Sequence, residues 1–312
     1  MARRQIGQEV LVFGDPVSER SRTLDGLAKM LDWSAIDTAL SPIYASTQGE
    51  EGWPPLALFK ALLLSIWYDL SDERLAEALD DRASFRRFCG FSRNEATPER
   101  TAFVRLRREL VARGLDCSLF DQVTEQLRAK CVRVRQGTLI DATVIASASR
   151  DDDEAGWSGH RSRKAVHSYK AHVTVDADDA LVETVAVTPG NVHDGKAGAG
   201  IVPEAPGTVY ADSAYQGDRF AGAVRAKGGQ TAVAATGYWA REGDREAEAR
   251  FLARNATIHR VRARIEKVFG TWKRSYGLRR MRWRGLAKCR LQVYLTATAY
   301  NLRRTLTILA AV

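Results

Sequence analysis

The chain has 312 residues, of which 45% are hydrophobic and 27% are charged, and this composition is typical of a soluble globular protein with a sizeable core. It contains no run of about 18 apolar residues, which argues against a transmembrane helix. Its first segment, MARRQIGQEVLVFGDP, lacks the apolar core of a signal peptide. We therefore expect a cytoplasmic protein without membrane contact. The four cysteines form no CxxC pair, which argues against zinc and against a disulfide framework.

The net charge of +9 is distributed unevenly along the chain. Between Arg254 and Arg290, thirteen lysines and arginines accompany a single acid, Glu266. This excess of positive charge is larger than that of the whole chain, so the remainder is slightly acidic. A basic segment of this size predicts a polyanionic partner. Nucleic acid is favoured over a membrane because no amphipathic apolar face accompanies the charge.

Residues 1–132 are predicted to form a helical domain. Helical patterns occupy 24–33 and 56–68, and two short helices are predicted between 70 and 91, where Ser71 is a candidate N-cap. A further helix begins at the Thr97-Pro98-Glu99 turn and ends at Gly114, and another covers 116–131. The helix that ends at Gly114 is the most basic of them.

Residues 133–312 are predicted to form a second domain of class α/β (α+β). β-branched and apolar runs predict strands over 137–147, 207–215 and 230–236, and a hairpin over 170–190. Helices are predicted over 194–202, 218–227 and 246–276. The resulting order β-β-β-α-β-α-β-α matches a ribonuclease-H-like mixed sheet. The acidic run and the residues after it, DDDEAGWSG over 151–159, are predicted to be an exposed loop.

Two aspartates in this second domain are candidates for chemistry. Asp141 lies within the first strand among apolar residues, where a carboxylate is costly to bury unless it is paired or binds a metal. Asp212 follows the fourth strand, and ligands of open sheets collect at the carboxyl ends of strands. The first and fourth strands are neighbours in this fold, so the two carboxylates can approach each other. The alternative is that Asp141 faces solvent.

The basic helix predicted over 246–276 carries a polar stripe beside an apolar face. At 3.6 residues per turn, His259, Arg262 and Lys273 lie within about 40° of Glu266. The stripe can therefore face the two aspartates while the apolar side packs on the sheet. Three carboxylates meeting there would suit two Mg²⁺ ions. Glu266 has two simpler interpretations, as an i,i+4 partner of Arg262 or as an acid on a solvated face.

The pattern His259-x2-Arg262-x3-Glu266-x6-Lys273 resembles the Tyr–Arg–Glu–Lys signature of DDE insertion-sequence transposases, with His in place of Tyr. The segments TLIDATVI and VYADSAYQG are similar to the two aspartate regions of that family, and YGLRRMRWRGLAKCRLQVYLTATAYNLRR is similar to its C-terminal end. The segment WPPLALFKALLLSIWYDLSDERLAEALDDRASFRRFCGF resembles the N-terminal helical domain of the insertion-sequence-5 type. The resemblance covers roughly residues 30 to 305.

This resemblance implies a transposase that cleaves DNA at the ends of an insertion sequence and transfers the strands into target DNA. Asp141, Asp212 and Glu266 would be both the catalytic and the metal-binding residues. They would hold two Mg²⁺ ions, for which Mn²⁺ would substitute. The implied partners are terminal inverted repeats, target DNA and a second copy of the chain on DNA. We expect a cytoplasmic, nucleoid-associated protein. The alternative is a catalytically silent DNA-binding protein, repressor-like or domesticated.

The residues expected to contact DNA are basic and come from both domains: Arg105, Arg107, Lys170, His259, Arg262, Lys273, Arg274, Arg279, Arg280 and Arg282. Two further residues in the motif NVHDGK, His193 and Asp194, are possible members of the active site. Helix capping by Asp194 is the alternative for that pair. The aromatic residues Tyr238 and Trp239 could stack on a displaced base, but packing in the core is the favoured interpretation of this pair.

Overall fold

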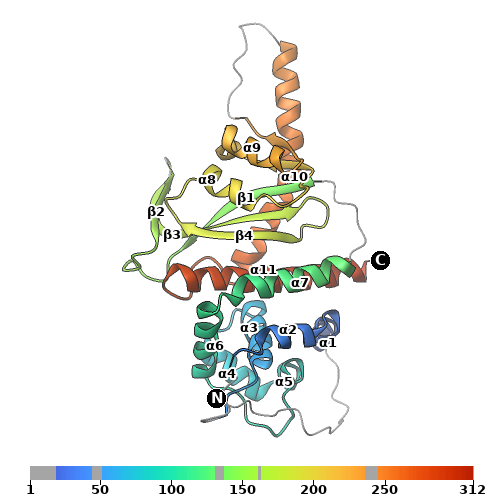
Figure 1. Cartoon of the computed structure of the whole chain (residues 1–312), viewed down its shortest axis with the longest axis vertical. Coiled ribbons are helices and arrows are strands. Elements are labelled where there is room, and N and C mark those ends of the chain that lie inside the picture. Colours follow the sequence, from blue (N-terminus) through green and yellow to red (C-terminus); the bar gives the residue numbers. More distant parts are fainter. Residues whose placement is uncertain (1–18, 44–50, 131–136, 161–162, 236–244, 312) are drawn as a thin grey trace. The chain divides into compact units, whose positions relative to one another are not determined.

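The computed structural model describes residues 19–43, 51–130, 137–160, 163–235 and 245–311, and Figure 1 shows its elements. The chain divides into two compact units. The first unit comprises residues 1–132, 275–277 and 294–312, and the second comprises 133–274 and 278–293. The last helix, α11 (Leu286–Ala310), is shared between them, because its first residues belong to the second unit and the rest to the first.

The described part of the first unit is helical. In chain order its helices are α1 (Glu19–Met30), α2 (Trp33–Leu40), α3 (Pro55–Trp67), α4 (Asp72–Asp81), α5 (Ala83–Cys89), α6 (Arg100–Ala112), α7 (Leu115–Lys130) and the later part of α11. The central helix α3 begins with Pro55 in its first turn, where a missing N–H costs nothing, and nearly all its side chains are buried. The indole N–H of Trp67 at its end donates to the carbonyl of Ala299 on α11 at 2.8 Å.

The ends of these helices follow from local chemistry. The predicted N-cap is confirmed, because the Ser71 hydroxyl accepts a hydrogen bond from the Arg74 N–H at 3.3 Å. Gly114 follows α6 with φ of +63°, a left-handed conformation that ends helices and favours glycine. Helix α2 was not predicted. It is capped by Asp32, whose side chain accepts from the Ser34 N–H at 3.0 Å.

The second unit is built on a mixed sheet. Its strands are β1 (Gly137–Ala146), β2 (Gly156–His160), β3 (Arg163–Asp176), β4 (Val182–Pro189), β5 (Thr208–Ala211) and β6 (Gln230–Val233). The order is β2-β3-β1-β5-β6, with β4 also paired to β3. Pairing of β3 with β1, β2 and β4 is antiparallel, whereas β1, β5 and β6 are parallel. The sequence had placed β2 in a loop, because its two glycines hide the strand pattern.

Helices cover both faces of this sheet (Figure 1). On one face, α8 (Asp194–Gly198), the 3-10 turn Ala199–Ile201 and α9 (Asp218–Ala226) enclose a buried apolar cluster of Ile140, Ile201, Val202, Val209, Ala211, Tyr215, Phe220 and Val224. Neighbouring residues of a strand point to opposite faces, so Asp141 points away from Ile140, toward α10 (Arg245–Arg274). The first turns of α10 extend beyond the sheet, and Leu252 there is 58% exposed.

The acidic turn after β1 is exposed at Asp151, Asp153 and Glu154, as predicted, and differs from the prediction at Asp152. Asp152 is buried, and its carboxylate accepts a hydrogen bond from the Gly285 N–H at 3.1 Å. The carboxylate of Glu154 accepts from the Leu286 N–H at 2.7 Å. Acids are favoured at this place because the first N–H groups of a helix, here α11, are unpaired and the helix dipole is positive there.

None of the described helices is long and apolar enough to cross a membrane. The cysteines in the described ranges, Cys89, Cys117 and Cys289, are free thiols, and Cys89 and Cys289 are buried. Burial raises the pKa of both buried thiols, to about 12 for Cys289. These buried thiols therefore act as apolar packing groups.

Candidate active site

Asp141 is a largely buried carboxylate in the middle of β1. Only 16% of its side chain is exposed, and both of its oxygens have partners. Oδ1 accepts from the Ala142 N–H at 2.8 Å, and Oδ2 accepts from the guanidinium of Arg262 on α10 at 2.9 Å. Arg262 is itself 7% exposed. The buried charge on β1 is thus compensated by a cation from the helix that covers this face.

Asp212 directly follows β5, and the parallel pairing of β5 with β1 brings it beside Asp141. The ladder pairs Thr138 with Val209 and Leu139 with Tyr210. The ladder ends there, and two residues further along each chain are Asp141 in β1 and Asp212 directly after β5, close enough for the charge of Asp212 to act on Asp141. Asp212 caps the 3-10 turn Ser213–Tyr215, because its Oδ1 accepts from the Ala214 N–H at 3.0 Å.

The pKa of Asp141 is raised by its burial and by the nearby charge of Asp212. Burial is the largest influence, and the charge of Asp212 acts in the same direction. The Arg262 guanidinium and the Ala142 N–H oppose them, and the balance raises the pKa of Asp141 from its ordinary value of 3.8 to about 6. Two carboxylates that disfavour each other's charge are a donor set that suits a divalent cation, which prefers oxygen ligands and would relieve the repulsion.

Glu266 lies one helical turn beyond Arg262 but is directed elsewhere. Its exposed side chain lines a hollow of about 430 Å³ together with Gly270, Lys273, Arg274 and Arg279. We call this feature the basic hollow. Among the residues that the structure describes, no three His, Cys, Asp or Glu side chains are grouped so that they could hold a metal ion. The structure therefore brings Asp141 and Asp212 together and leaves Glu266 among cations.

The basic hollow contains several of the residues expected to contact DNA. Arg274 and Arg279 are exposed, and the Arg279 Nε donates to the carbonyl of Lys273 at 3.2 Å. Burial and the charge of Arg279 lower the pKa of Lys273. His259 is exposed on α10, two turns before Glu266. An anion in the hollow would therefore be attracted by three cations and repelled by one acid.

Arg280 and Arg282 lie in the segment that leads from α10 to α11. Arg280 donates from its guanidinium to the carbonyls of Ser147 at 3.1 Å and Ala148 at 2.6 Å, which fixes the chain just after β1. The Arg282 N–H donates to the side-chain carbonyl of Gln292 at 2.8 Å, and its side chain is half-buried. Both arginines thus have positions set by the fold of the second unit.

Lys170, His193 and Asp194 form one group at the start of α8. The Lys170 ammonium donates to Asp194 Oδ1 and to the carbonyl of Val192, both at 2.9 Å. The cap of α8 is His193, whose Nδ1 accepts from the Gly195 N–H at 3.2 Å, so the expectation of capping by Asp194 is corrected. His193 takes this role because it is the last residue before the helix with extended backbone.

Tyr215 connects this group to the aspartate pair, and sequence reasoning did not single it out. Burial raises its pKa well above the ordinary value, and the charges of Asp141, Asp194 and Asp212 add to the effect. Asp194 therefore lies in the electrostatic neighbourhood of the aspartate pair. The only sequence signal was the position of Tyr215 three residues after Asp212, within the same motif.

The two arginines predicted on the basic helix of the first unit differ from each other. Arg105 is exposed on α6. Arg107 is buried and forms a bidentate ion pair with Asp72, with distances of 2.8 and 2.6 Å. The charge of Arg107 is thus used inside the unit, and we do not carry it into the DNA-binding proposal. Tyr238 and Trp239 lie outside the described residues.

A mixed sheet with one aspartate in a strand and a second directly after the neighbouring parallel strand, covered by a helix rich in cations, is consistent with the ribonuclease-H-like domain of DDE enzymes. Residues 133–302 match the family model described as a Transposase DDE domain, and residues 12–109 match the one described as a Transposase domain (DUF772). The chain belongs to the DDE transposases of insertion-sequence type. Enzymes of this family cut and join nucleic acid strands, depend in general on divalent metals, and have DNA as their partner.

Proposed function

We propose that this chain is an insertion-sequence-5-type transposase that cleaves DNA strands at the ends of its element and transfers them into target DNA. Asp141, Asp212 and Glu266 are its catalytic carboxylates in this proposal. The observation that carries it is the proximity of the two aspartates, which are close enough for the charge of Asp212 to raise the pKa of Asp141. The alternative, a catalytically silent relative, would not require this costly pair.

The metal in this proposal is Mg²⁺, with two ions per site and Mn²⁺ as a substitute. It would supply polarisation of the scissile phosphodiester and activation of the attacking oxygen. The two aspartates hold it in place. Arg262 keeps Asp141 ionised, because its positive charge lowers the pKa that burial raises. Glu266 lies one turn from Arg262 and lines the basic hollow. Its part in the proposal rests on the resemblance of its motif to the family signature and requires its carboxylate to move toward the pair when metal and DNA are bound.

Backbone phosphates of DNA bind in the basic hollow in this proposal. Lys273, Arg274 and Arg279 line the hollow, and His259 extends the contact along α10. Lys170, Arg280 and Arg282 contribute to the local field, although their side chains have roles within the fold. Each phosphate that a cation neutralises adds to the salt dependence of binding. The helical first unit, with Arg105 on its surface, reads the terminal inverted repeats.

Transposition joins two ends of one element to one target, so we propose that the chain works as a homodimer on DNA. Each of the two similar ends of the element is then bound by one of two identical subunits. We place the protein in the cytoplasm, associated with the nucleoid, on the basis of its basic surface and the absence of a membrane-spanning helix among the described helices.

The test is strand cleavage of a duplex that carries the element's end, with Mg²⁺ or with EDTA. The variants are Asp212→Asn and Glu266→Gln, and the matched control is Glu248→Gln, an exposed glutamate in the first turns of α10. We expect metal-dependent nicking by the natural protein and by the control, and none by either variant, while fluorescence anisotropy shows near-normal DNA binding for all. A scrambled end should not be cut.

Two outcomes would contradict this proposal in different ways. Cleavage by Glu266→Gln would remove Glu266 from the catalytic set while leaving the aspartate pair. Binding of the correct end without nicking under any divalent metal would favour the catalytically silent relative, and the basic hollow would then serve only to hold DNA.

A further inference from the structure

The carboxylate of Asp212 is held by a short turn that lies beyond the ladder of β1 and β5. This ladder ends two residues before Asp141 and Asp212. The turn Ser213–Tyr215 is capped by Asp212 itself, whose Oδ1 accepts from the Ala214 N–H at 3.0 Å. The position of Asp212 relative to Asp141 therefore depends on what packs against this turn.

Helix α8 packs closely on that turn, because two of its residues are glycines. A Cβ atom at Gly195 would lie 2.7 Å from the Ala214 carbonyl oxygen, and one at Gly198 would overlap the ring of Tyr215. Neither glycine has a positive φ, so the packing needs their lack of a side chain and not their conformational freedom. A Cβ at Gly200, just after α8, would meet no atom of the described residues within 4 Å.

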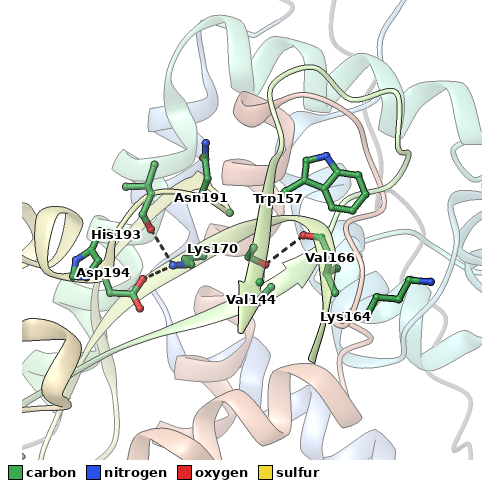
Figure 2. A pocket seen from close by; sticks show the side chains of 12 residues that line it. Val144, Trp157, Lys164, Val166, Lys170, Asn191, His193 and Asp194 are labelled. Atoms are coloured by element: carbon green, nitrogen blue, oxygen red, sulfur yellow. Dashed lines mark hydrogen bonds and ion pairs between the residues drawn. The ribbon is translucent and has the colours of Figure 1, made fainter. Parts of the chain in front are cut away.

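Lys170 fixes the start of α8 to the sheet. Its ammonium group donates to the carbonyl of Val192 and to Asp194 Oδ1, both at 2.9 Å (Figure 2). The side chains of Lys170 and Asp194 are 16% and 24% exposed, so this ion pair is only weakly screened by solvent. Asp141 pairs with Val173 on β3, and side chains alternate along a strand, so Lys170 points to the face opposite Asp141. Its influence on the aspartate pair must therefore pass through α8.

His172 lies beside Asp194 without adding charge. It is fully buried, its Nε2 lies 2.9 Å from the Thr188 hydroxyl, and its Nδ1 lies 4.0 Å from Asp194 Oδ1. Burial lowers the pKa of His172 to about 4, although the charge of Asp194 acts to raise it. The imidazole is therefore neutral at neutral pH, and within this group Lys170 supplies the positive charge that Asp194 faces.

Tyr215 lies between α8 and the aspartate pair. It is 1% exposed and belongs to the apolar cluster on the α8 face of the sheet. The charges of Asp141, Asp194 and Asp212 all raise its pKa, so the phenol is near both groups. Direct contacts therefore lead from Lys170 through Asp194 and α8 to the turn that holds Asp212.

We propose that Lys170, Asp194 and the two glycines of α8 are positioning residues for the metal site. The ion pair holds α8 on the sheet, α8 holds the turn Ser213–Tyr215, and the turn sets the distance between the carboxylates of Asp212 and Asp141. In this inference none of the positioning residues touches the metal or the DNA. The inference rests on the proposed function, because it takes the aspartate pair as the metal site.

The test measures binding of Mn²⁺ alone to the full chain, through the electron paramagnetic resonance signal of free Mn²⁺, so that it does not depend on cleavage. We expect Gly195→Ala to weaken Mn²⁺ binding roughly 10- to 100-fold, the usual effect of losing a group that orients a metal ligand. The matched control, Gly200→Ala, adds the same methyl group in open space and should stay within about twofold of the natural protein.

A second set of variants separates positioning from general packing. Lys170→Met should weaken Mn²⁺ binding, and the double variant with Asp194→Asn should bind no more weakly, because the lysine acts through that carboxylate. The control is Lys227→Met, since Lys227 also donates to a carbonyl, that of Val202, and pairs with a carboxylate, that of Glu204, at 3.0 Å. Lys227→Met should leave Mn²⁺ binding unchanged even where it lowers the midpoint of thermal unfolding.

Different outcomes overturn this inference and the proposed function. If Gly195→Ala and Lys170→Met bind Mn²⁺ like the natural protein, or if Gly200→Ala loses as much affinity, the positioning role is refuted and the proposed function is untouched. If Lys170→Met weakens only the binding of a blunt DNA duplex in EDTA and lowers its salt dependence, Lys170 is a DNA contact and the inference is wrong. Equal Mn²⁺ binding by the natural protein and Asp212→Asn would instead refute the metal site of the proposed function.

Discussion

Replacing Asp141 by asparagine should stabilise the metal-free protein at neutral pH. The pKa of Asp141 is raised from 3.8 to about 6 in the folded state, chiefly by burial. Between these values the folded state holds a proton that the unfolded state has released, so stability from this group is fully present below about pH 3.8 and is lost as the pH rises through 6. The full loss is about 3 kcal/mol, at 1.36 kcal/mol per pKa unit.

Asparagine resembles the protonated acid in size and charge and therefore escapes this loss. By linkage the stability difference between Asp141→Asn and the natural protein should grow by about 2 kcal/mol between pH 4 and pH 7.5. For a unit of this size that corresponds to about 4–8 °C in the midpoint of thermal unfolding. Differential scanning calorimetry in EDTA at both pH values measures it.

The control is Asp153→Asn, which changes an exposed carboxylate in the turn after β1. It should give the same midpoint difference at both pH values. If the advantage of Asp141→Asn is constant with pH, or shrinks as the pH rises, then burial does not govern the charge of Asp141. The argument from the aspartate pair to a metal-binding site would then lose its physical basis.

Three further predictions concern single side chains. Arg262→Met removes the main influence that lowers the pKa of Asp141, so the loss of stability should move to a pH above about 6, which calorimetry with and without Asp141→Asn detects. Arg107→Met leaves Asp72 without its bidentate partner and should cost about 3 kcal/mol in urea denaturation, whereas a DNA contact alone would cost no stability. Ser71→Ala should cost about 1 kcal/mol, and Ser71→Gly a few tenths, if capping of α4 is the cause.

Much of the sheet could be predicted because its strands are apolar and bounded by turn residues. The segments around Asp141 and Asp212 have this pattern. Their proximity could be predicted because the two strands are neighbours in the expected order of the sheet. β2 could not be predicted, since its short glycine-containing sequence forms a strand only by pairing with β3. The pairing is a tertiary effect that no local pattern encodes.

The helix pattern predicted a stripe on α10 but not which member of it reaches the sheet. Arg262 and Glu266 differ by about 40° and one turn of rise, and only the packing of α10 decides that Arg262 contacts Asp141. Arg107 shows the same limit. Its burial depends on Asp72, 35 residues away in sequence, so composition made it look like a surface cation. Which of several basic side chains becomes buried depends on acidic partners that are distant in the sequence, and a local pattern does not reveal these partners.

The acidic turn at the start of α11 changes how much DNA the basic C-terminal segment can bind. A free helix N-terminus attracts phosphate. Here the carboxylate oxygens of Asp152 and Glu154 already accept hydrogen bonds from the N–H groups that a phosphate would use. A DNA strand would have to displace both carboxylates, at no gain in charge neutralisation. In the proposed function, the segment therefore offers fewer phosphate sites than its thirteen cations suggest, and we expect the DNA backbone to bind at Lys273, Arg274 and Arg279 instead.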